Sequence, residues 1–215
     1  MHYTSVLFDL DGTLLDTLGD LTAAMNRTLT RHGLPERTRQ QMRAALGNGA
    51  RRLMELSVPA GTDSALFETL LAEYNADYAA HCRIETAPYP GVAALLLKLH
   101  AQGRKLAIVS NKPDEAVRAL RADFFAGAVP IAVGETAAIR RKPAPDMLLA
   151  AMEQLGADPA GTVFVGDSEV DIATARAANL PCISVLWGFR DRDVLERAGA
   201  QQFAADIAQL QALLG

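Results

Sequence analysis

V-L-F-D-L-D-G-T-L-L-D-T, residues 6–17, is the stretch that decides how the rest of the chain folds. The apolar run from Ser5 to Phe8 is short and bounded by polar residues, which predicts a buried parallel strand. Asp9 follows at the carboxyl end of that strand, where open α/β sheets bind their ligands. Asp11 comes two residues later, so an extended backbone would turn both carboxylates to one side. Gly12 allows a sharp turn and the close approach of a ligand to the backbone.

Two carboxylates this close repel each other, which raises the pKa of one of them unless a cation lies between them. A divalent cation would keep a carboxylate ionised, and hard oxygen ligands suit Mg²⁺ better than zinc. A solvated turn is the alternative interpretation, because Asp and Gly are common in turns. The complete stretch, from Asp9 through Gly12 and Thr13 to Thr17 after an apolar strand, favours chemistry.

Length and composition limit the class of protein. A chain of 215 residues holds one large domain or two modest ones, and 50% hydrophobic with 21% charged residues is typical of soluble globular proteins. A net charge of −4 without a long basic run argues against nucleic acid as a partner. No apolar segment is long enough to span a bilayer, the strand begins too early for a signal peptide, and Cys82 and Cys182 are too few for a disulfide framework. We therefore expect a cytoplasmic enzyme, either monomer or homodimer.

Helical periodicity dominates the chain after Thr17. Apolar residues at three-and-four spacing predict helices over about 18–33, 38–46, 50–56 and 63–80, and no strand pattern occurs between Thr17 and Ile84. The breaker-rich stretch from Thr86 to Gly91 then marks a return to the main domain. The sequence therefore predicts an all-helical cap domain, residues 17–85, inserted into a core domain made of residues 1–16 and 86–215.

Strands and helices alternate through the rest of the chain. Strands are expected at 105–109, 129–133, 162–165 and 182–186, and helices at 92–100, from 113, at 143–155, at 169–178 and at 204–214. This alternation predicts an α/β fold, a Rossmann-like parallel sheet with helices on both faces. Right-handed crossovers bring the carboxyl ends of all the strands to one edge. Asp9, Ser110, Asn111 and Asp167, each placed just after a strand, should therefore lie together.

Three polar groups at or near this edge have a functional interpretation, and each also has a simpler structural one. Ser110 and Asn111 offer donors for phosphate oxygens, or they cap the helix that follows. Lys142, in R-R-K-P-A-P, offers a compact ammonium that would balance Asp9 and phosphate, or it belongs to an exposed basic face with Arg140 and Arg141. Asp167 would hold a metal, and Asp171, one helical turn later, would hold the metal's waters or Lys142. Alternatively, the two residues are a cap and a first-turn acid of the helix that follows.

The four clusters D-L-D-G-T, S-N, K-P and G-D-S-E-V-D resemble, in order, the motifs of the phosphatase branch of the haloacid dehalogenase superfamily, and the resemblance covers nearly the whole chain. It implies that Asp9 attacks phosphorus and forms an aspartyl phosphate, while Asp11 is the general acid and base. It also implies Mg²⁺ as cofactor. The implied phosphate-binding residues are Gly12, Thr13, Ser110, Asn111 and Lys142. The implied metal-binding residues are Asp9, Asp11 and Asp167, supported by Asp171.

The substrate must be decided by the cap, where L-G-N-G-A-R-R at residues 46–52 is the most informative segment. Gly47 and Asn48 would let backbone amides approach an anion, and Arg51 or Arg52 would pair with a carboxylate. Solvated arginines at a helix junction are the alternative. The segment resembles the cap of phosphoglycolate phosphatases, which implies a small phosphorylated metabolite, 2-phosphoglycolate, as substrate.

Other activities remain open at this stage. They are hydrolysis of a sugar phosphate, pyrophosphate or nucleotide, a phosphomutase on the same scaffold, and a non-catalytic phospho-receiver module. A phosphonate-cleaving enzyme would need a lysine in the cap, and no Lys occurs between Thr17 and Pro90.

Overall fold

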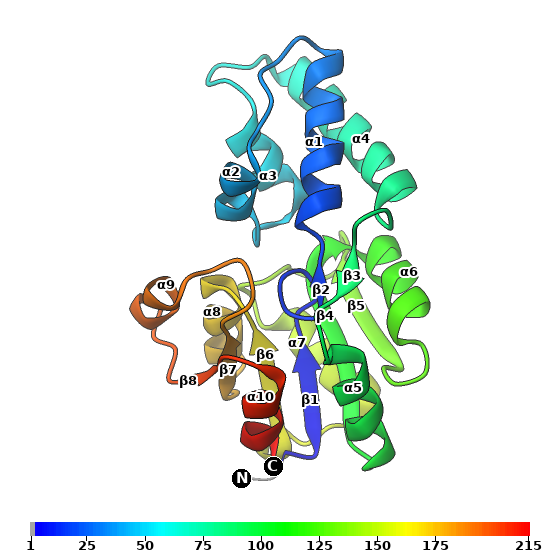
Figure 1. Cartoon of the computed structure of the whole chain (residues 1–215), viewed down its shortest axis with the longest axis vertical. Helices are drawn as coiled ribbons and strands as arrows, with labels where there is room; N and C mark the ends of the chain where they lie inside the picture. Colours follow the sequence, from blue (N-terminus) through cyan, green and yellow to red (C-terminus); the bar gives the residue numbers. More distant parts are fainter. Residues whose placement is uncertain (1–2) are drawn as a thin grey trace. The chain divides into compact units, whose positions relative to one another are not determined.

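The computed structural model describes residues 3–215 and divides the chain into two compact units (Figure 1). One unit, here called the core, consists of Met1–Leu15 and Pro88–Gly215, and the other, called the cap, consists of Asp16–Ala87. The short strands β2, Leu15–Asp16, and β3, Ala87–Pro88, pair where the chain passes from one unit to the other. The cap is thus a single insertion between the first strand of the core and the rest of it.

The core is built on a six-stranded sheet with the order β5-β4-β1-β6-β7-β8. Every neighbouring pair is parallel, and in the centre Leu7 lies opposite Ala107 on one side and Phe164 on the other. The parallel α/β sheet expected from the alternating pattern is confirmed. The strands are β1 Ser5–Phe8, β4 Lys105–Pro113, β5 Ile131–Glu135, β6 Thr162–Gly166, β7 Cys182–Val185 and β8 Gln202–Ala204.

Helices cover both faces of this sheet (Figure 1). On one face of the sheet, Leu7 and Phe164 pack against Met147 of α7 (Asp146–Leu155) and Ala175 of α8 (Glu169–Ala177). These four side chains are fully buried. Alternation along β1 turns Val6 and Phe8 to the opposite face. The core helices are α5 Val92–Ala101, α6 Asp114–Phe125, α7 Asp146–Leu155, α8 Glu169–Ala177, α9 Arg192–Arg197 and α10 Ile207–Leu214, with a 3₁₀ turn at Pro159–Gly161.

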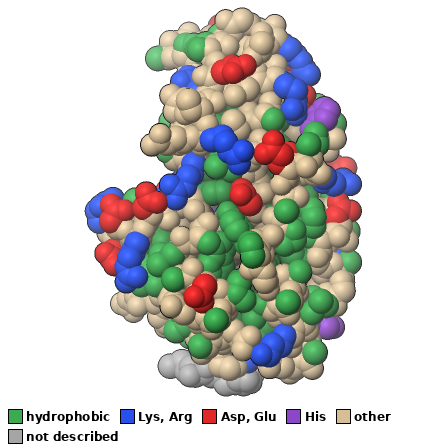
Figure 2. Space-filling view, in the orientation of Figure 1, with side chains coloured by type: hydrophobic (Ala, Val, Ile, Leu, Met, Phe, Trp, Pro, Cys, Tyr) green, Lys and Arg blue, Asp and Glu red, His purple; other side chains and the backbone are tan. Residues whose placement is uncertain are grey.

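Helix α9 and strand β8 of the core are absent from the sequence prediction, as are the short strands β2 and β3 and the 3₁₀ turn. The expected sheet had five strands, and the sixth, β8, starts within what was expected as the approach to the last helix, which begins at Ile207 rather than near Ala204. Helix α9 was missed because Leu195 is its one buried residue, and its charged residues are exposed to solvent. Its ion pairs join Arg192 with Glu196 and Arg197 with Asp193. Figure 2 shows basic and acidic side chains lying close together at the left of the molecule. A periodicity test cannot detect a helix that has no apolar stripe.

The cap consists of four helices: α1 Leu18–Arg31, α2 Arg39–Ala45, α3 Gly49–Ser57 and α4 Ser64–His81. Thr38 and Gln41 form a reciprocal capping box at the start of α2, and the carboxylate of Asp63 accepts hydrogen bonds from two amides that begin α4. Asp20 closes the unit, because its side chain accepts hydrogen bonds from the amides of Ile84, Glu85 and Thr86. The expected all-helical insert is confirmed. Among residues 3–215, no helix has the length and apolar character needed to cross a membrane.

Candidate active site

The ends of two adjacent core strands, and the helix that follows one of them, bring the predicted acidic residues together. Asp9 follows β1, and Asp167 follows β6, the strand beside it. Asp9, Asp167 and Asp171 each present a carboxylate oxygen, and these three atoms lie within 4.8 Å of one another. All three side chains are buried. The convergence expected from parallel topology is therefore present in the core.

Lys142 provides a cation inside this cluster. Its Nζ lies 2.8 Å from Asp9 Oδ1 and 2.7 Å from Asp171 Oδ1, and its side chain is only 2% exposed. Asn111 holds the backbone that carries it: Asn111 Nδ2 donates to the Lys142 carbonyl at 2.9 Å, and the Lys142 amide donates to Asn111 Oδ1 at 2.8 Å. The amide of Asn111 thus positions Lys142, and its predicted role toward phosphate stays a prediction.

Asp171 serves the helix and the cluster at once. Its Oδ2 accepts hydrogen bonds from the Ser168 amide and hydroxyl at 3.0 and 2.6 Å, which caps α8, while its Oδ1 contacts Lys142. The two interpretations of this acid, a helix-terminal group and a part of the site, are therefore compatible. The position of Asp171 in the first turn of α8 gives its carboxylate a defined direction.

Asp167 is oriented through both of its oxygens. Oδ1 accepts a hydrogen bond from the Thr13 hydroxyl at 3.2 Å, and Oδ2 accepts one from the Phe189 amide at 2.7 Å. Gly12, with φ of +85°, has no room for a side chain, because a Cβ there would collide with the Asp167 carboxylate. Thr13, which the resemblance assigned to phosphate, uses its hydroxyl to hold a predicted metal-binding residue.

Asp11 faces a different set of partners. Lys112 Nζ lies 3.1 Å from Asp11 Oδ1, and the Ser110 hydroxyl donates to Asp11 Oδ2 at 3.4 Å. The pairing of β4 with β5 shifts register between Val109 and Pro113, so Ser110–Lys112 lie in an irregular segment of the kind often found beside active sites. Lys112 was missed by the sequence analysis. Its signal was alternation, since Ser110 and Lys112 point to Asp11 while Asn111 points to Lys142.

Burial and like charge dominate the electrostatics of the cluster. Burial, and then the charge of Asp171, raise the pKa of Asp9 well above its ordinary value. The same two causes raise the pKa of Asp167 to about 7. Burial alone would lower the pKa of Lys142, but the charges of Asp171 and Asp9 outweigh it and raise that pKa. Three carboxylates around one ammonium leave an excess of negative charge, which either protons or a bound cation must neutralise.

This donor set fits Mg²⁺. Carboxylate oxygens are the ligands that this hard cation prefers, and the cluster offers two of them, from Asp9 and Asp167, that Lys142 alone does not neutralise. Asp171 has both oxygens engaged by Lys142 and Ser168, and its supporting role toward the metal stays a prediction. Cysteine and histidine ligands, which zinc prefers, are absent from the metal-compatible group found among residues 3–215.

The predicted substrate residues of the cap form a separate group. Asn48 precedes α3 between two glycines in the left-handed region, Gly47 with φ of 108° and Gly49 with φ of 78°. Arg51 forms a two-point ion pair with Glu68 at 2.7 and 2.9 Å, and Arg52 pairs with Glu55. These arginines are exposed, as the solvated-junction interpretation also expects. The roles of Gly47, Asn48 and Arg51 in substrate binding stay predictions.

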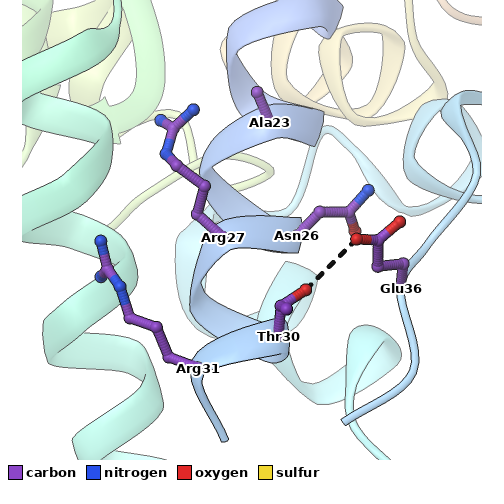
Figure 3. A pocket seen from close by; sticks show the side chains of 6 residues that line it. All are labelled: Ala23, Asn26, Arg27, Thr30, Arg31 and Glu36. Carbon is purple, nitrogen blue, oxygen red and sulfur yellow. Dashed lines mark hydrogen bonds between the residues drawn. The ribbon is translucent and has the colours of Figure 1, made fainter. Parts of the chain in front are cut away.

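A shallow pocket elsewhere in the cap contains none of the predicted site residues (Figure 3). Arg27 and Arg31 project from α1 on one side of it, while Asn26 and Thr30 project on the other, where the Thr30 hydroxyl donates to Glu36 at 3.2 Å. The arginines are engaged by Asp77 of α4. This pocket is therefore bordered by an internal ion cluster of the cap. Ala23 completes its lining.

Comparison with known proteins gives matches that span the chain. The family profile described as haloacid dehalogenase-like hydrolase matches residues 6–185. A phosphoglycolate phosphatase of Xanthomonas campestris pv. campestris is 35% identical over 187 residues, which cover 86% of this chain and 84% of that protein. An N-acetylmuramic acid 6-phosphate phosphatase of Pseudomonas aeruginosa is 34% identical over 190 residues, covering 88% and 84%.

Solved structures share the fold over the same extent. A protein of Lactobacillus delbrueckii subsp. bulgaricus, provisionally assigned as a phosphoglycolate phosphatase, superposes with a TM-score of 0.94 at 35% identity and covers 100% of this chain and 99% of its own. A hydrolase from Pseudomonas syringae gives a TM-score of 0.79 at 26% identity, with coverage of 98% and 97%.

Proposed function

Because this chain belongs to the haloacid dehalogenase-like hydrolases, we propose that it is a Mg²⁺-dependent phosphatase that hydrolyses 2-phosphoglycolate through an aspartyl-phosphate intermediate. The observation that carries the proposal is the buried cluster of Asp9, Asp167 and Asp171 around Lys142. Buried carboxylates in excess of their cations destabilise the folded protein unless a bound cation compensates them. Such a cluster is therefore expected where a cation and a phosphoryl group are to be bound. The core supplies every residue of this reaction centre.

The proposed reaction has two steps. In the first, Asp9 Oδ attacks phosphorus, the bond from phosphorus to the substrate oxygen breaks, and Asp11 gives its proton to the departing alkoxide. In the second, Asp11 takes a proton from water, and the resulting hydroxide displaces Asp9 to release inorganic phosphate. Bound Mg²⁺ would neutralise phosphoryl oxygens during both displacements. Lys142 supports Asp9 and adds a fixed positive charge beside the developing negative charge.

The choice of substrate rests on the relatives rather than on the reaction centre, because one fold serves many substrates. The Xanthomonas relative is named for phosphoglycolate, and this favours a two-carbon phosphomonoester with a carboxylate. The Pseudomonas aeruginosa relative is named for a phosphorylated sugar acid at nearly the same identity, and this makes N-acetylmuramic acid 6-phosphate the second candidate. Gly47, Asn48 and Arg51 remain the proposed cap residues that recognise the remainder of the substrate.

The test is phosphate release by the purified full chain. With Mg²⁺, the protein should hydrolyse p-nitrophenyl phosphate, and excess EDTA should abolish the reaction. Among 2-phosphoglycolate, N-acetylmuramic acid 6-phosphate, pyrophosphate and a nucleoside monophosphate, 2-phosphoglycolate should give the highest kcat/KM. A higher kcat/KM for another member of the panel would reassign the substrate. A rate of phosphate release that is unchanged by excess EDTA would contradict the metal dependence.

Asp9→Asn tests the nucleophile. The variant keeps the shape of the side chain but cannot form the acyl phosphate, so kcat should fall by at least about 10⁴-fold. The matched control is Asp193→Asn, the same chemical change on the exposed surface of α9, which should retain wild-type kcat. Folding of Asp9→Asn is verified by its circular dichroism and melting temperature. Turnover near the wild-type rate in a folded Asp9→Asn protein would remove Asp9 from the mechanism.

A further inference from the structure

The segment Trp187–Arg190, here called the strap, leaves the end of β7 and crosses toward α9 without regular secondary structure (Figure 1). None of the four sequence motifs includes it. The chain is still anchored to the sheet at Leu186, whose amide donates to the Ala204 carbonyl at 2.9 Å. Beyond that point, Gly188 and Phe189 are buried although they belong to a loop. A buried loop must have its polar groups satisfied by specific partners, and these partners define what the strap does.

The first partner is Asp167. The amide of Phe189 donates to Asp167 Oδ2 at 2.7 Å, a short, charge-assisted hydrogen bond. Gly188 packs against the same carboxylate, because a Cβ at this position would lie 2.5 Å from Asp167 Oδ2. The φ of Gly188 lies outside the left-handed region, so glycine is needed here for space and not for backbone conformation.

The second partner is the turn that follows Asp11. The indole Nε1 of Trp187 donates to the Thr13 carbonyl at 3.1 Å, and a Cβ at Gly188 would lie 2.5 Å from the Gly12 carbonyl oxygen. The Trp187 ring also lies 6.5 Å from the ring of Tyr89, measured between centroids. The strap is therefore in contact with two of the predicted motifs at once, the turn after β1 and the acid after β6.

The far end of the strap is anchored as well. Arg190 forms a two-point ion pair with Glu169, at 2.7 Å from Nε to Oε2 and 3.1 Å from Nη2 to Oε1. Glu169 begins α8, only two residues after Asp167. The Arg190 side chain is 10% exposed, so this pair is shielded from water more than a surface pair.

We propose that the strap is a positioning device which sets the orientation of Asp167 for Mg²⁺ and locks it to the Gly12–Thr13 turn. The inference rests on the magnesium site of the proposed function and adds residues to it. The Thr13 hydroxyl and the Phe189 amide hold one lone pair on each oxygen of Asp167, so the remaining lone pairs are directed in a fixed way. Groups that orient metal ligands in this manner change metal affinity by roughly 10–100-fold when they are removed.

The test is Mg²⁺ binding to the metal-free full chain without substrate. Trp187 is the one tryptophan of the sequence, so its fluorescence reports on the strap directly, and isothermal calorimetry gives the Kd independently. Gly188→Ala should push Asp167 and the Gly12 turn apart and raise the Kd for Mg²⁺ at least tenfold. Raising Mg²⁺ to saturation should recover part of the lost turnover of p-nitrophenyl phosphate, because mass action restores occupancy of the metal site.

The matched control is Gly127→Ala. Gly127 also lacks the left-handed conformation, and an added Cβ there meets nothing nearer than Leu97 Cδ2 at 3.9 Å. The control should bind Mg²⁺ with wild-type Kd. If Gly188→Ala binds Mg²⁺ as tightly as wild type does, or loses kcat at saturating Mg²⁺ with its Kd unchanged, the strap does not have this role. If the wild-type chain itself binds no Mg²⁺, the proposed function fails instead, so the two failures are distinguishable.

Trp187→Phe provides a second variant, which keeps an aromatic ring at this position and removes the indole donor together with part of the ring area. Its Kd, measured by calorimetry, should rise about threefold, less than for Gly188→Ala because the Phe189 amide still holds Asp167. Melting temperatures of all variants separate positioning from global stability. The three variants Gly127→Ala, Trp187→Phe and Gly188→Ala are compared with wild type. The inference would be overturned if their Kd values for Mg²⁺ rose in proportion to the loss of melting temperature and bore no relation to contact with Asp167. If Gly188→Ala fails to fold, Trp187→Phe decides, and an unchanged Kd in that variant is then the contrary result.

Discussion

The core and the cap each bury an aspartate among cations, but with opposite charge balance. In the core, Lys142 is shared by Asp9 and Asp171, with Asp167 beside them, so carboxylates outnumber cations. In the cap, Asp77 alone accepts hydrogen bonds from Arg27 at 2.6 Å and Arg31 at 3.1 Å, with His81 3.6 Å away, so cations outnumber carboxylates.

The pKa values of the buried aspartates differ between core and cap in the direction that this charge balance predicts. In the core, burial is reinforced by like charge, which raises the pKa of Asp9 and Asp167. In the cap, burial alone would raise the pKa of Asp77, but its hydrogen bond and charge interaction with Arg27, helped by His81 and Arg31, lower it. A buried acid with surplus cations is already satisfied and holds helices together. A buried acid with too few cations is prepared to receive one, which distinguishes a site from a structural ion pair.

Removal of Lys142 should have the largest effect. Lys142→Met leaves Asp9 and Asp171 without their shared ammonium and takes a fixed positive charge from the reaction, so kcat/KM should fall by about 10³-fold. Lys98→Met, the same change on the exposed face of α5, is the control. The measurement is steady-state phosphate release at saturating Mg²⁺. A decrease smaller than tenfold would show that Mg²⁺ alone balances the cluster.

Removal of Lys112 should have a smaller effect on the same reaction. Lys112→Met takes the ammonium away from Asp11 while leaving Asp9 with Lys142, so we expect kcat/KM to fall about 10–100-fold through the general acid and base. The decrease should appear in kcat at saturating substrate, because Asp11 takes part in both proposed steps. An unchanged kcat with only a raised KM would assign Lys112 to substrate binding instead. Lys98→Met again serves as the control.

Neutralising the cap acid should affect stability and not turnover. Asp77→Asn leaves Arg27 and Arg31 facing a neutral amide, and we expect a loss of about 1–2 kcal/mol in the free energy of unfolding, because Arg31 is half exposed and screened by water. Urea unfolding measures this value, and kcat per folded molecule should be unchanged. An Asp77→Asn protein with wild-type stability would show that this cap network is only a surface arrangement.

The two regions should also respond oppositely to pH. The folded-state pKa of Asp167, about 7, lies above its ordinary value of 3.8, so its contribution to stability is present below pH 4 and is lost as the pH rises through 7. The pKa of Asp77 is lowered, so its contribution is present above pH 4 and is lost as the pH falls through the folded-state value. Mg²⁺ must displace protons from the core acids at low pH.

The melting temperature should therefore rise more on addition of Mg²⁺ at pH 8 than at pH 5. Thermal scans of the metal-free and Mg²⁺-loaded protein at the two values measure the difference. Asp77→Asn should preserve it, because its charge belongs to the cap. An equal Mg²⁺ effect at both pH values would contradict the charge balance assigned to the core.

Local pattern was sufficient for most of the fold and for the acidic centre. Ser5–Phe8 is short, apolar and buried on both faces, so its strand could be recognised from composition, and Asp9 and Asp167 could be placed because parallel topology forces their strand ends together. Helix α9 and strand β8 could not be recognised, because neither has a hydrophobic period of its own. Most residues of α9 face solvent, and β8 is a three-residue strand that is defined by pairing with its neighbour. Lys112 was overlooked because its partner, Asp11, lies about a hundred residues away in sequence.

The sequence by itself determined that this is an α/β chain with a helical insert and with acidic residues just after the strands of its sheet, because hydrophobic period and chain order are local properties. Tertiary structure alone decided how those groups are used. It assigned Asn111 to the backbone of Lys142 and Thr13 to Asp167, placed Lys112 beside Asp11, and brought the strap against Asp167. The physical reason is that a hydrogen bond or ion pair depends on distance in space, and only the packed sheet brings residues this remote in sequence within 3 Å or so of each other.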